Sequence, residues 1–246
     1  MRSIRLYADA PLVPGAEATL PATAAAHAVR VLRLKIGDAV TLFNGDGHEY
    51  PARLVAAGAR ELRAKVEAQA SPQRESPLRI TLIQALARGE KMDWIIQKAT
   101  ELGAADVVPV VTERSEVKLD ASRSEKRMER WRAVTIAACE QCGRNMLPRI
   151  ETPVALAAWL DTNAAPQSTT RWMLHPESAT HMRGLQVSSP ATLELAVGPE
   201  GGFGENDLAV LRAHGFHGLA LGPRILRTET AGIAAIAALQ ALCGDL

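Results

Sequence analysis

VGPEGGFG, residues 197–204, decides the fold of this chain together with a second segment, LGPRILRTETA, residues 221–231. Each segment follows a short apolar run typical of a β-strand and leads into a pattern typical of a helix. Ligands of α/β sheets usually bind outside the carboxyl ends of the strands. The two loops therefore predict one pocket that is built from both.

The chain around these loops alternates between strand and helix patterns from Leu78 onward. Met92, Ile95 and Ile96 recur at helical spacing, and Gly103 stands where a helix would end. Such alternation predicts an α/β domain with a largely parallel sheet. The predicted strands are 79–87, 106–111, 172–175, 193–198 and 218–222, and the predicted helices are 91–102, one from 122 onward, 206–214 and 230–242.

Residues 1–70 carry several strand patterns and one short helix pattern, which predicts a small β-rich barrel. Asn44-Gly45-Asp46-Gly47 is a strong hairpin signal, because Asn and Gly tolerate positive φ. Strand patterns flank it at 37–43, 49–57 and 61–69, and a short helix is predicted at 22–34. Residues 71–77, SPQRESP, read as a linker because they hold two prolines and no apolar residue. The predicted division is therefore 1–70, a linker at 71–77, and 78–246.

Composition excludes several protein classes. Lys and Arg number 28 against 27 Asp and Glu, so the net charge of +1 by itself indicates no nucleic-acid partner. No apolar run reaches the roughly 20 residues that span a bilayer, and the N-terminus lacks a signal-peptide pattern. We therefore expect a cytoplasmic protein with no membrane partner. Cys139 and Cys142 have metal or redox spacing but no second pair, so we interpret them as two partly buried thiols and expect no metal site.

The chemistry of the two loops narrows the ligand. A phosphate-binding Walker loop needs Gly-Lys-Ser/Thr, which is absent, and Gly202-Phe203-Gly204 matches only part of a dinucleotide fingerprint. Glycines let backbone N–H and C=O groups approach a ligand, and Ile225 and Leu226 could wall an adenine ring. A neutral pocket beside a helix start suits an adenosyl group with a short zwitterionic tail, as in S-adenosylmethionine, better than ATP.

The two loops and three upstream segments together resemble the bacterial ribosomal RNA small-subunit uridine N3-methyltransferase family, which belongs to the SPOUT superfamily. The upstream matches are KMDWIIQKATELG at 91–103, Glu113-Arg114-Ser115, and EQCGRN at 140–145 followed by Pro148. Cys142 stands where a small residue such as Ser is expected. In the N-terminal part, HAVRVLRLKIGD at 27–38 also fits. The similarity covers essentially the whole chain.

This resemblance implies an N-terminal PUA-like β-barrel that binds RNA and a C-terminal α/β domain with a deep trefoil knot. It also implies a homodimer, which agrees with a last helix, 231–239, that is apolar nearly all round. The implied cofactor is S-adenosylmethionine. By resemblance its pocket uses Leu174, His175, Gly198, Glu200, Gly201, Gly202, Leu221, Gly222, Ile225, Leu226, Arg227, Thr228 and Ala231.

The implied reaction moves a methyl group to N3 of a uridine in 16S rRNA of the small ribosomal subunit, uridine 1498 by resemblance. A carboxylate could take the N3 proton, and a guanidinium could stabilise the charge left on the carbonyl oxygens. The candidate bases are Glu200 and Glu229, and Arg227 is the candidate stabiliser. Glu229 could instead simply occupy a helix N-terminus, where an anion is favoured. Candidate RNA contacts are Arg30, Arg33, Arg114, Arg144 and Asn145.

Other functions stay open at this point. One is a different SPOUT RNA methyltransferase that acts on a ribose 2′-hydroxyl or another base. Another is a non-catalytic RNA-binding assembly factor, although such a protein would not need intact cofactor loops. A metabolic enzyme that binds an adenine cofactor is a further alternative, but it would leave the N-terminal barrel without a purpose.

Overall fold

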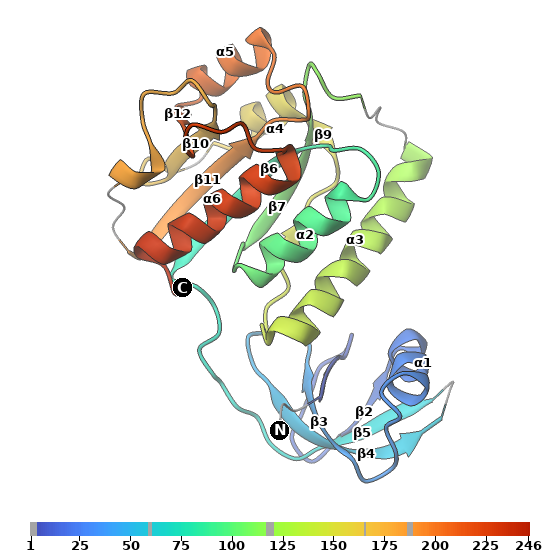
Figure 1. Ribbon diagram of the computed structural model, residues 1–246. Coiled ribbons are helices and arrows are strands. Elements are labelled where there is room, and N and C mark those ends of the chain that lie inside the picture. The colour runs from blue at the N-terminus through green and yellow to red at the C-terminus, as the bar shows by residue number, and fades with distance from the viewer. Residues whose placement is uncertain (1–3, 59–60, 117–120, 165, 186–188) are drawn as a thin grey trace. The chain divides into compact units, whose positions relative to one another are not determined.

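The computed structural model describes residues 4–58, 61–116, 121–164, 166–185 and 189–246, without the side chains of His27 and residues 121–123. The described chain forms two compact units (Figure 1). The first unit contains residues up to Glu75 together with Ile136–Leu147. The second contains Ser76–Thr135 and Pro148–Leu246.

The first unit is built on a five-stranded sheet in the order β1-β3-β4-β5-β2. β1 runs parallel to β3, and the other neighbours are antiparallel. Inward-facing residues alternate along β4, as expected for a sheet with one buried face. The bounds are β1 Ile4–Tyr7, β2 Glu17–Leu20, α1 Ala22–Arg30, β3 Ala39–Phe43, β4 Tyr50–Ala57 and β5 Leu62–Val66.

The helix predicted at 22–34 ends at Arg30. Arg33 has φ of +54°, which an L-residue in a helix does not adopt, and the Leu34 N–H donates to the Ala28 carbonyl oxygen. The chain therefore reverses over these residues instead of continuing the helix.

A distant segment completes the first unit. The helix α3, Ala121–Cys142, contributes its last residues, and Cys139 packs against Tyr7 and Phe43. Arg5 is buried, and its guanidinium donates to the Asn145 side-chain oxygen at 2.6 Å and pairs with Glu49 at 2.9 Å. Residues about 140 positions apart in the sequence thus share one buried polar network.

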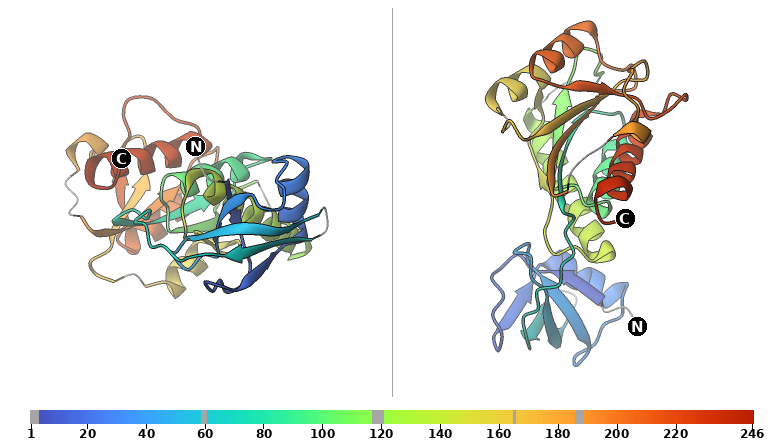
Figure 2. Two further views of the ribbon diagram at one scale, coloured as in Figure 1. Left: turned by 90° about the horizontal axis from the view of Figure 1, so that it is seen from below. Right: turned by 90° about the vertical axis from the view of Figure 1, so that its left-hand side faces the viewer.

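The second unit is an α/β sandwich with helices on both sides of its sheet (Figure 2). The sheet has seven strands in the order β12-β10-β11-β6-β7-β8, with β9 beside β7. Every pairing is parallel, so the predicted parallel sheet is confirmed. The strands are β6 Leu78–Ala85, β7 Asp106–Val111, β8 Arg149–Ile150, β9 Val154–Ala155, β10 Thr170–Leu174, β11 Ala191–Val197 and β12 His217–Leu219. The helices besides α3 are α2 Lys91–Glu101, α4 Leu156–Thr162, the short 3-10 helix η1 Met182–Gly184, α5 Glu205–Ala213 and α6 Thr228–Cys243.

Helices cover both faces of this sheet. On one face α2 and α6 pack over Ile80 and Leu82 of β6, and on the other α4 and α5 pack over Ile83 and Ala85. Successive side chains of a strand point to opposite faces of the sheet, and both faces are covered by helices. For this reason β6 carries apolar residues on both faces. No helix of the described residues is long and apolar enough to cross a membrane.

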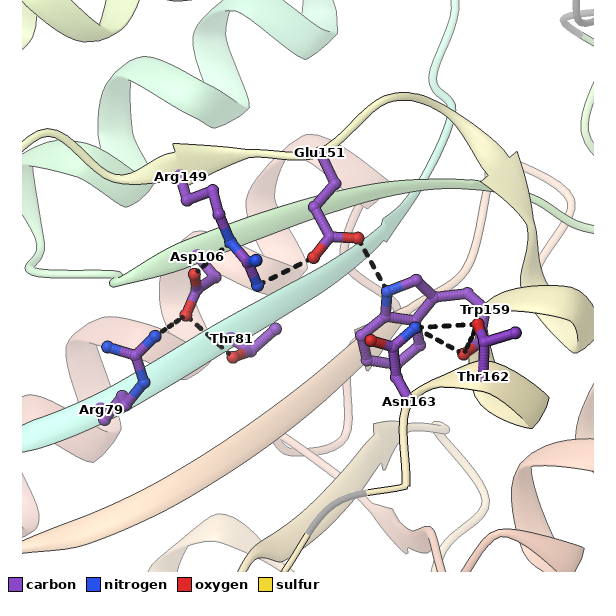
Figure 3. Close-up of polar contacts among 8 residues, drawn as sticks. All are labelled: Arg79, Thr81, Asp106, Arg149, Glu151, Trp159, Thr162 and Asn163. Carbon is purple, nitrogen blue, oxygen red and sulfur yellow. Dashed lines mark hydrogen bonds and ion pairs between the residues drawn. The ribbon is translucent and has the colours of Figure 1, made fainter.

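A polar cluster fixes the amino-terminal edge of the sheet (Figure 3). Asp106, at the start of β7, is only 4% exposed, and its carboxylate accepts from Arg79 at 2.7 Å and from Arg149 at 3.1 Å. Glu151 joins Arg149 to the indole N–H of Trp159 on α4. The Asp106 bonds join β6, β7 and β8 at the end of the strands opposite to the loops that follow β10, β11 and β12. The bond of Glu151 ties α4 to β8.

Candidate functional site

A cavity of about 290 Å³ lies at the carboxyl ends of β10, β11 and β12. Its wall comes from the loops that follow these strands, from the first turn of α6, and from Arg114 in the loop after β7. This is the edge of a parallel sheet where ligands bind. All the residues of the predicted cofactor set line the cavity except Glu200, Gly201 and Arg227. Those that line it are Leu174, His175, Gly198, Gly202, Leu221, Gly222, Ile225, Leu226, Thr228 and Ala231.

The glycines of the first loop serve a tight turn. A Cβ on Gly198 would lie 3.0 Å from the Phe203 nitrogen and 3.2 Å from the Gly202 carbonyl carbon, closer than most Cβ atoms come to a neighbour, so the turn would have to shift. Gly202 has φ of +70°, and its N–H donates to the Pro199 carbonyl oxygen at 2.9 Å. The backbone of residues 198–203 therefore folds back on itself and forms one wall of the cavity.

Thr228 joins the two loops beneath the cavity. Its buried hydroxyl donates to the Gly198 carbonyl oxygen at 2.6 Å and accepts from the Gln84 side-chain amide at 2.9 Å. Gln84 is fully buried at the end of β6, and its amide also donates to the Ala85 carbonyl oxygen. One hydroxyl thus links β6, the loop after β11 and the start of α6.

Lys91, the first residue of α2, brings the two candidate bases together. Its Nζ lies 2.8 Å from the Glu200 Oε1 and 3.5 Å from the Glu229 Oε2. Burial raises the pKa of Glu200, but hydrogen bonds from Lys91 and from the backbone N–H groups of Glu200 and Arg88 outweigh it, so its pKa is lowered. The hydrogen bond to Glu200 in turn raises the pKa of Lys91. Neither carboxylate lines the cavity itself.

The loop after β7 supports the site from the other side. Arg114 is exposed, lines the cavity and donates from Nη1 to the Gly201 carbonyl oxygen at 2.9 Å. The buried Asp207 accepts from the backbone N–H groups of Glu113 and Gly204, which ties this loop to the start of α5. Arg114 is therefore held between the cavity and solvent.

The remaining predicted residues divide by exposure. Arg227 is exposed just before α6, where its carbonyl oxygen accepts from the Thr230 and Ala231 N–H groups. Arg30 and Arg33 of the first unit are also exposed. Arg144 and Asn145 are buried, with Arg144 paired to Glu75 at 2.6 Å and Asn145 bonded to Arg5. Internal partners therefore occupy the Arg144 guanidinium and the Asn145 side-chain oxygen, while the buried Asn145 side-chain nitrogen has no hydrogen-bond partner among the described residues. The assignment of both residues to RNA contact stays a prediction.

Sequence reasoning did not assign Gln84 and Lys91 to the site. It also left out six residues that line the cavity: Pro176, Val197, Pro199, Phe203, Leu219 and Arg224. A polar side chain near the carboxyl end of a buried strand pattern was an available signal for Gln84. For Lys91 the available signal was weaker: it opens the matched segment 91–103, but nothing local indicates that α2 begins opposite Glu200 and Glu229.

Comparison with known proteins identifies the family. Residues 74–240 match the model of an RNA methyltransferase domain, and residues 20–67 match that of an RNA methyltransferase PUA domain. The chain is 32% identical over 219 residues to the ribosomal RNA small subunit methyltransferase E of Buchnera aphidicola, covering 89% of this chain and 85% of the relative. The chain belongs to the ribosomal RNA small subunit methyltransferase E family. The family predicted from the two loops and the upstream motifs is thereby confirmed, and the protein is an RNA methyltransferase.

Solved structures similar to this member of the methyltransferase E family extend the comparison. A putative methyltransferase from Legionella pneumophila, in complex with the cofactor SAM, is 39% identical with a TM-score of 0.94. The ribosomal RNA small subunit methyltransferase E from Neisseria gonorrhoeae, bound to S-adenosyl methionine, is 36% identical with a TM-score of 0.90. Both alignments cover 100% of each chain.

Proposed function

We propose that the protein transfers the methyl group of S-adenosylmethionine to N3 of a uridine in 16S rRNA of the small ribosomal subunit, uridine 1498 by family resemblance. The observation that carries this proposal is the cavity at the carboxyl ends of β10, β11 and β12, built from the segments 197–204 and 221–231. Two similar proteins with bound S-adenosylmethionine support the choice of cofactor.

The residues around the cavity fit this cofactor. The wall combines apolar side chains such as Leu174, Leu221 and Leu226 with the backbone of the 198–203 turn, where a Cβ on Gly198 would be crowded. Apolar walls suit the adenine ring. A phosphate-binding loop for a nucleoside triphosphate would require a lysine after the glycines, and none follows them here. When bound, S-adenosylmethionine would supply an activated methyl group on a sulfonium.

The two carboxylates on Lys91 have unequal suitability as the base. Glu200 accepts hydrogen bonds from Lys91 and the Arg88 N–H, and its lowered pKa makes it a weak proton acceptor. The Oε2 of Glu229 is buried and accepts no hydrogen bond, and its ion pair with Lys91 is longer, at 3.5 Å. We therefore favour Glu229 as the group that takes the N3 proton, while the N3 electron pair forms the bond to the methyl carbon and the sulfur keeps the electrons of the broken bond.

Charged residues at the rim would receive the RNA. Arg227 precedes α6 with an exposed guanidinium, which suits it to the oxyanion that develops on the uridine carbonyl groups. Arg114 is in reach of both the cavity and solvent and suits a phosphate or the displaced base. Arg30 and Arg33 are the exposed candidates for RNA contact in the first unit.

The finer points of architecture belong to the same proposal. They are a SPOUT-type trefoil knot, a homodimer, and a division into an RNA-binding part at 1–70, a linker at 71–77 and a methyltransferase part at 78–246. Leu242 of α6 is 52% exposed, and Ile233, Ala234, Ala237 and Ala238 are only partly buried, which supports a subunit interface on this helix. Sedimentation of the purified protein as a monomer would contradict the homodimer.

The test combines binding with product analysis. Calorimetry should detect binding of S-adenosylmethionine, and small ribosomal subunits lacking the modification should gain one methyl group when incubated with protein and cofactor. Digestion of the rRNA to nucleosides and mass spectrometry then locate the methyl group. A methyl group on a ribose or another base would replace the N3 assignment, and binding without any transfer would favour a non-catalytic assembly factor.

A further inference from the structure

Lys91 is the cation that both candidate bases share. Its ammonium pairs with Glu200 from the loop after β11 and with Glu229 from the first turn of α6. Three elements that are far apart in the sequence therefore meet at one Nζ. The side chains of Lys91, Glu200 and Glu229 are 31%, 34% and 18% exposed, so this cluster is half-buried and only partly screened by water.

The other charged groups nearby are engaged elsewhere. Arg88 offers Glu200 its backbone N–H at 3.2 Å, while its guanidinium pairs with Glu116. Glu90, which precedes Lys91, pairs with Arg130. Among the ion pairs of the described residues, Lys91 is the partner of both Glu200 and Glu229.

Without the Lys91 ammonium, the negative charges of Glu200 and Glu229 would repel each other, because both carboxylates are partly withdrawn from water. The two contacts are unequal, at 2.8 Å with a hydrogen bond to Glu200 and 3.5 Å to Glu229. The nearer carboxylate is thus the fixed counter-ion, whereas the Oε2 of the farther one, Glu229, is held less closely and accepts no hydrogen bond from the described residues.

We propose that Lys91 is a positioning residue of the methyl-transfer site: it anchors Glu200 as its counter-ion and holds Glu229 beside it, ready to accept the uridine N3 proton. This proposal rests on the proposed function. It assigns Lys91 no contact with substrate or cofactor. Its effect passes through the orientation and charge of the two carboxylates.

Substituting Lys91 should therefore change the pH dependence of the reaction as well as its rate. In Lys91→Met the two carboxylates lose their shared cation, and Glu200 loses the hydrogen bond that lowers its pKa. Two partly buried like charges are then left side by side, so the acid limb of the rate profile should move to higher pH by about one unit. The single-turnover rate near neutral pH should fall about tenfold or more, because the base is less well oriented. Lys91→Arg keeps the positive charge, so it should reverse part of the pH shift and part of the loss of rate.

The experiment measures single-turnover methyl transfer to small ribosomal subunits across pH for the wild type, Lys91→Met and Lys91→Arg. Lys98→Met is the matched control, since Lys98 lies on the same helix but pairs with Glu101 at 2.8 Å. Calorimetry with S-adenosylmethionine and thermal unfolding are run on each variant to separate loss of cofactor binding or folding from loss of positioning.

A shifted acid limb in Lys91→Met, partly restored in Lys91→Arg and absent in Lys98→Met, supports the proposal. An active wild type whose pH profile is unchanged in Lys91→Met overturns the role of Lys91 and leaves the proposed function intact. If Lys91→Met does not fold, an unshifted profile in Lys91→Gln has the same meaning. A wild type that transfers no methyl group overturns the proposed function, and the role of Lys91 fails with it.

Discussion

Replacing Thr228 with Val should loosen the site and destabilise the protein. Valine keeps the shape of threonine but lacks the hydroxyl that donates to Gly198 and accepts from Gln84. Thr228 is only 5% exposed, so little water reaches its hydroxyl. The Gly198 carbonyl oxygen would lose its buried donor, whereas the Gln84 amide would keep its second bond, to Ala85.

The magnitude follows from these partners. One buried acceptor left without a donor costs about 1–3 kcal/mol, and the partly satisfied Gln84 amide adds less. We expect a loss of about 2 kcal/mol in the free energy of unfolding. For a protein of this length that loss lowers the melting temperature by about 4–8 °C.

The assay is thermal unfolding, followed by calorimetry with S-adenosylmethionine. The Gly198 turn forms a wall of the cavity, so its loosening should weaken cofactor binding as well. Thr228→Ser keeps the hydroxyl and should lie closer to the wild type than Thr228→Val does. Thr230→Val, two residues further along α6 and exposed, is the matched control. A change in Thr228→Val of less than about 0.5 kcal/mol, the level of an ordinary surface substitution, would refute the reasoning.

Three further predictions concern other parts of the chain. Gly198→Ala should weaken S-adenosylmethionine binding about tenfold or more by calorimetry, because its Cβ would lie 3.0 Å from the Phe203 nitrogen, whereas Gly201→Ala, 3.5 Å from the Arg114 Cβ, should bind nearly normally. Burial and a hydrogen bond to Asp46 raise the pKa of Tyr50 to about 12, so ultraviolet titration should find the phenol ionising near that pH, and Asp46→Asn should lower the pKa. The stability gained from the neutral phenol is present below pH 10 and is lost as the pH rises through about 12. Arg30→Gln with Arg33→Gln should reduce the salt-dependence slope of RNA binding by about 1.4–1.8, whereas Arg63→Gln, whose charge is paired with Glu17 and Glu61, should change it less; an unchanged slope in the double variant removes these residues from the RNA contact.

Much of the second unit could be predicted from the sequence, because its elements carry strong local patterns. Apolar runs located β6, β7, β10, β11 and β12, and helical spacing located α2, α5 and α6 within a few residues. The strands β8 and β9 have two residues each, and their pairing comes from backbone bonds and tertiary packing that leave no periodic pattern. The short helix α4 follows them and was missed for the same reason.

The candidate site was predictable in its loops and unpredictable in its connections. Glycines at 198, 202 and 222 indicate a tight backbone by their residue type alone. The bond between Gln84 and Thr228, and the ion pairs of Lys91, join residues more than 100 positions apart. Such partners depend on how the sheet is ordered, and no local pattern encodes that order.

The segment Ile136–Leu147 has a consequence for how this protein is made. The first unit needs it, because Cys139 fills the space beside Tyr7 and Phe43, and Asn145 accepts from the buried Arg5. A ribosome synthesises residues 1–75 long before it reaches this segment. The nascent first unit must therefore wait, with an incomplete core and an unsatisfied arginine, until about seventy more residues of the chain have been made. A gene fragment that stops at residue 75 would encode the first unit with the same incomplete core. An insertion between residues 75 and 136 would leave both parts of the first unit intact.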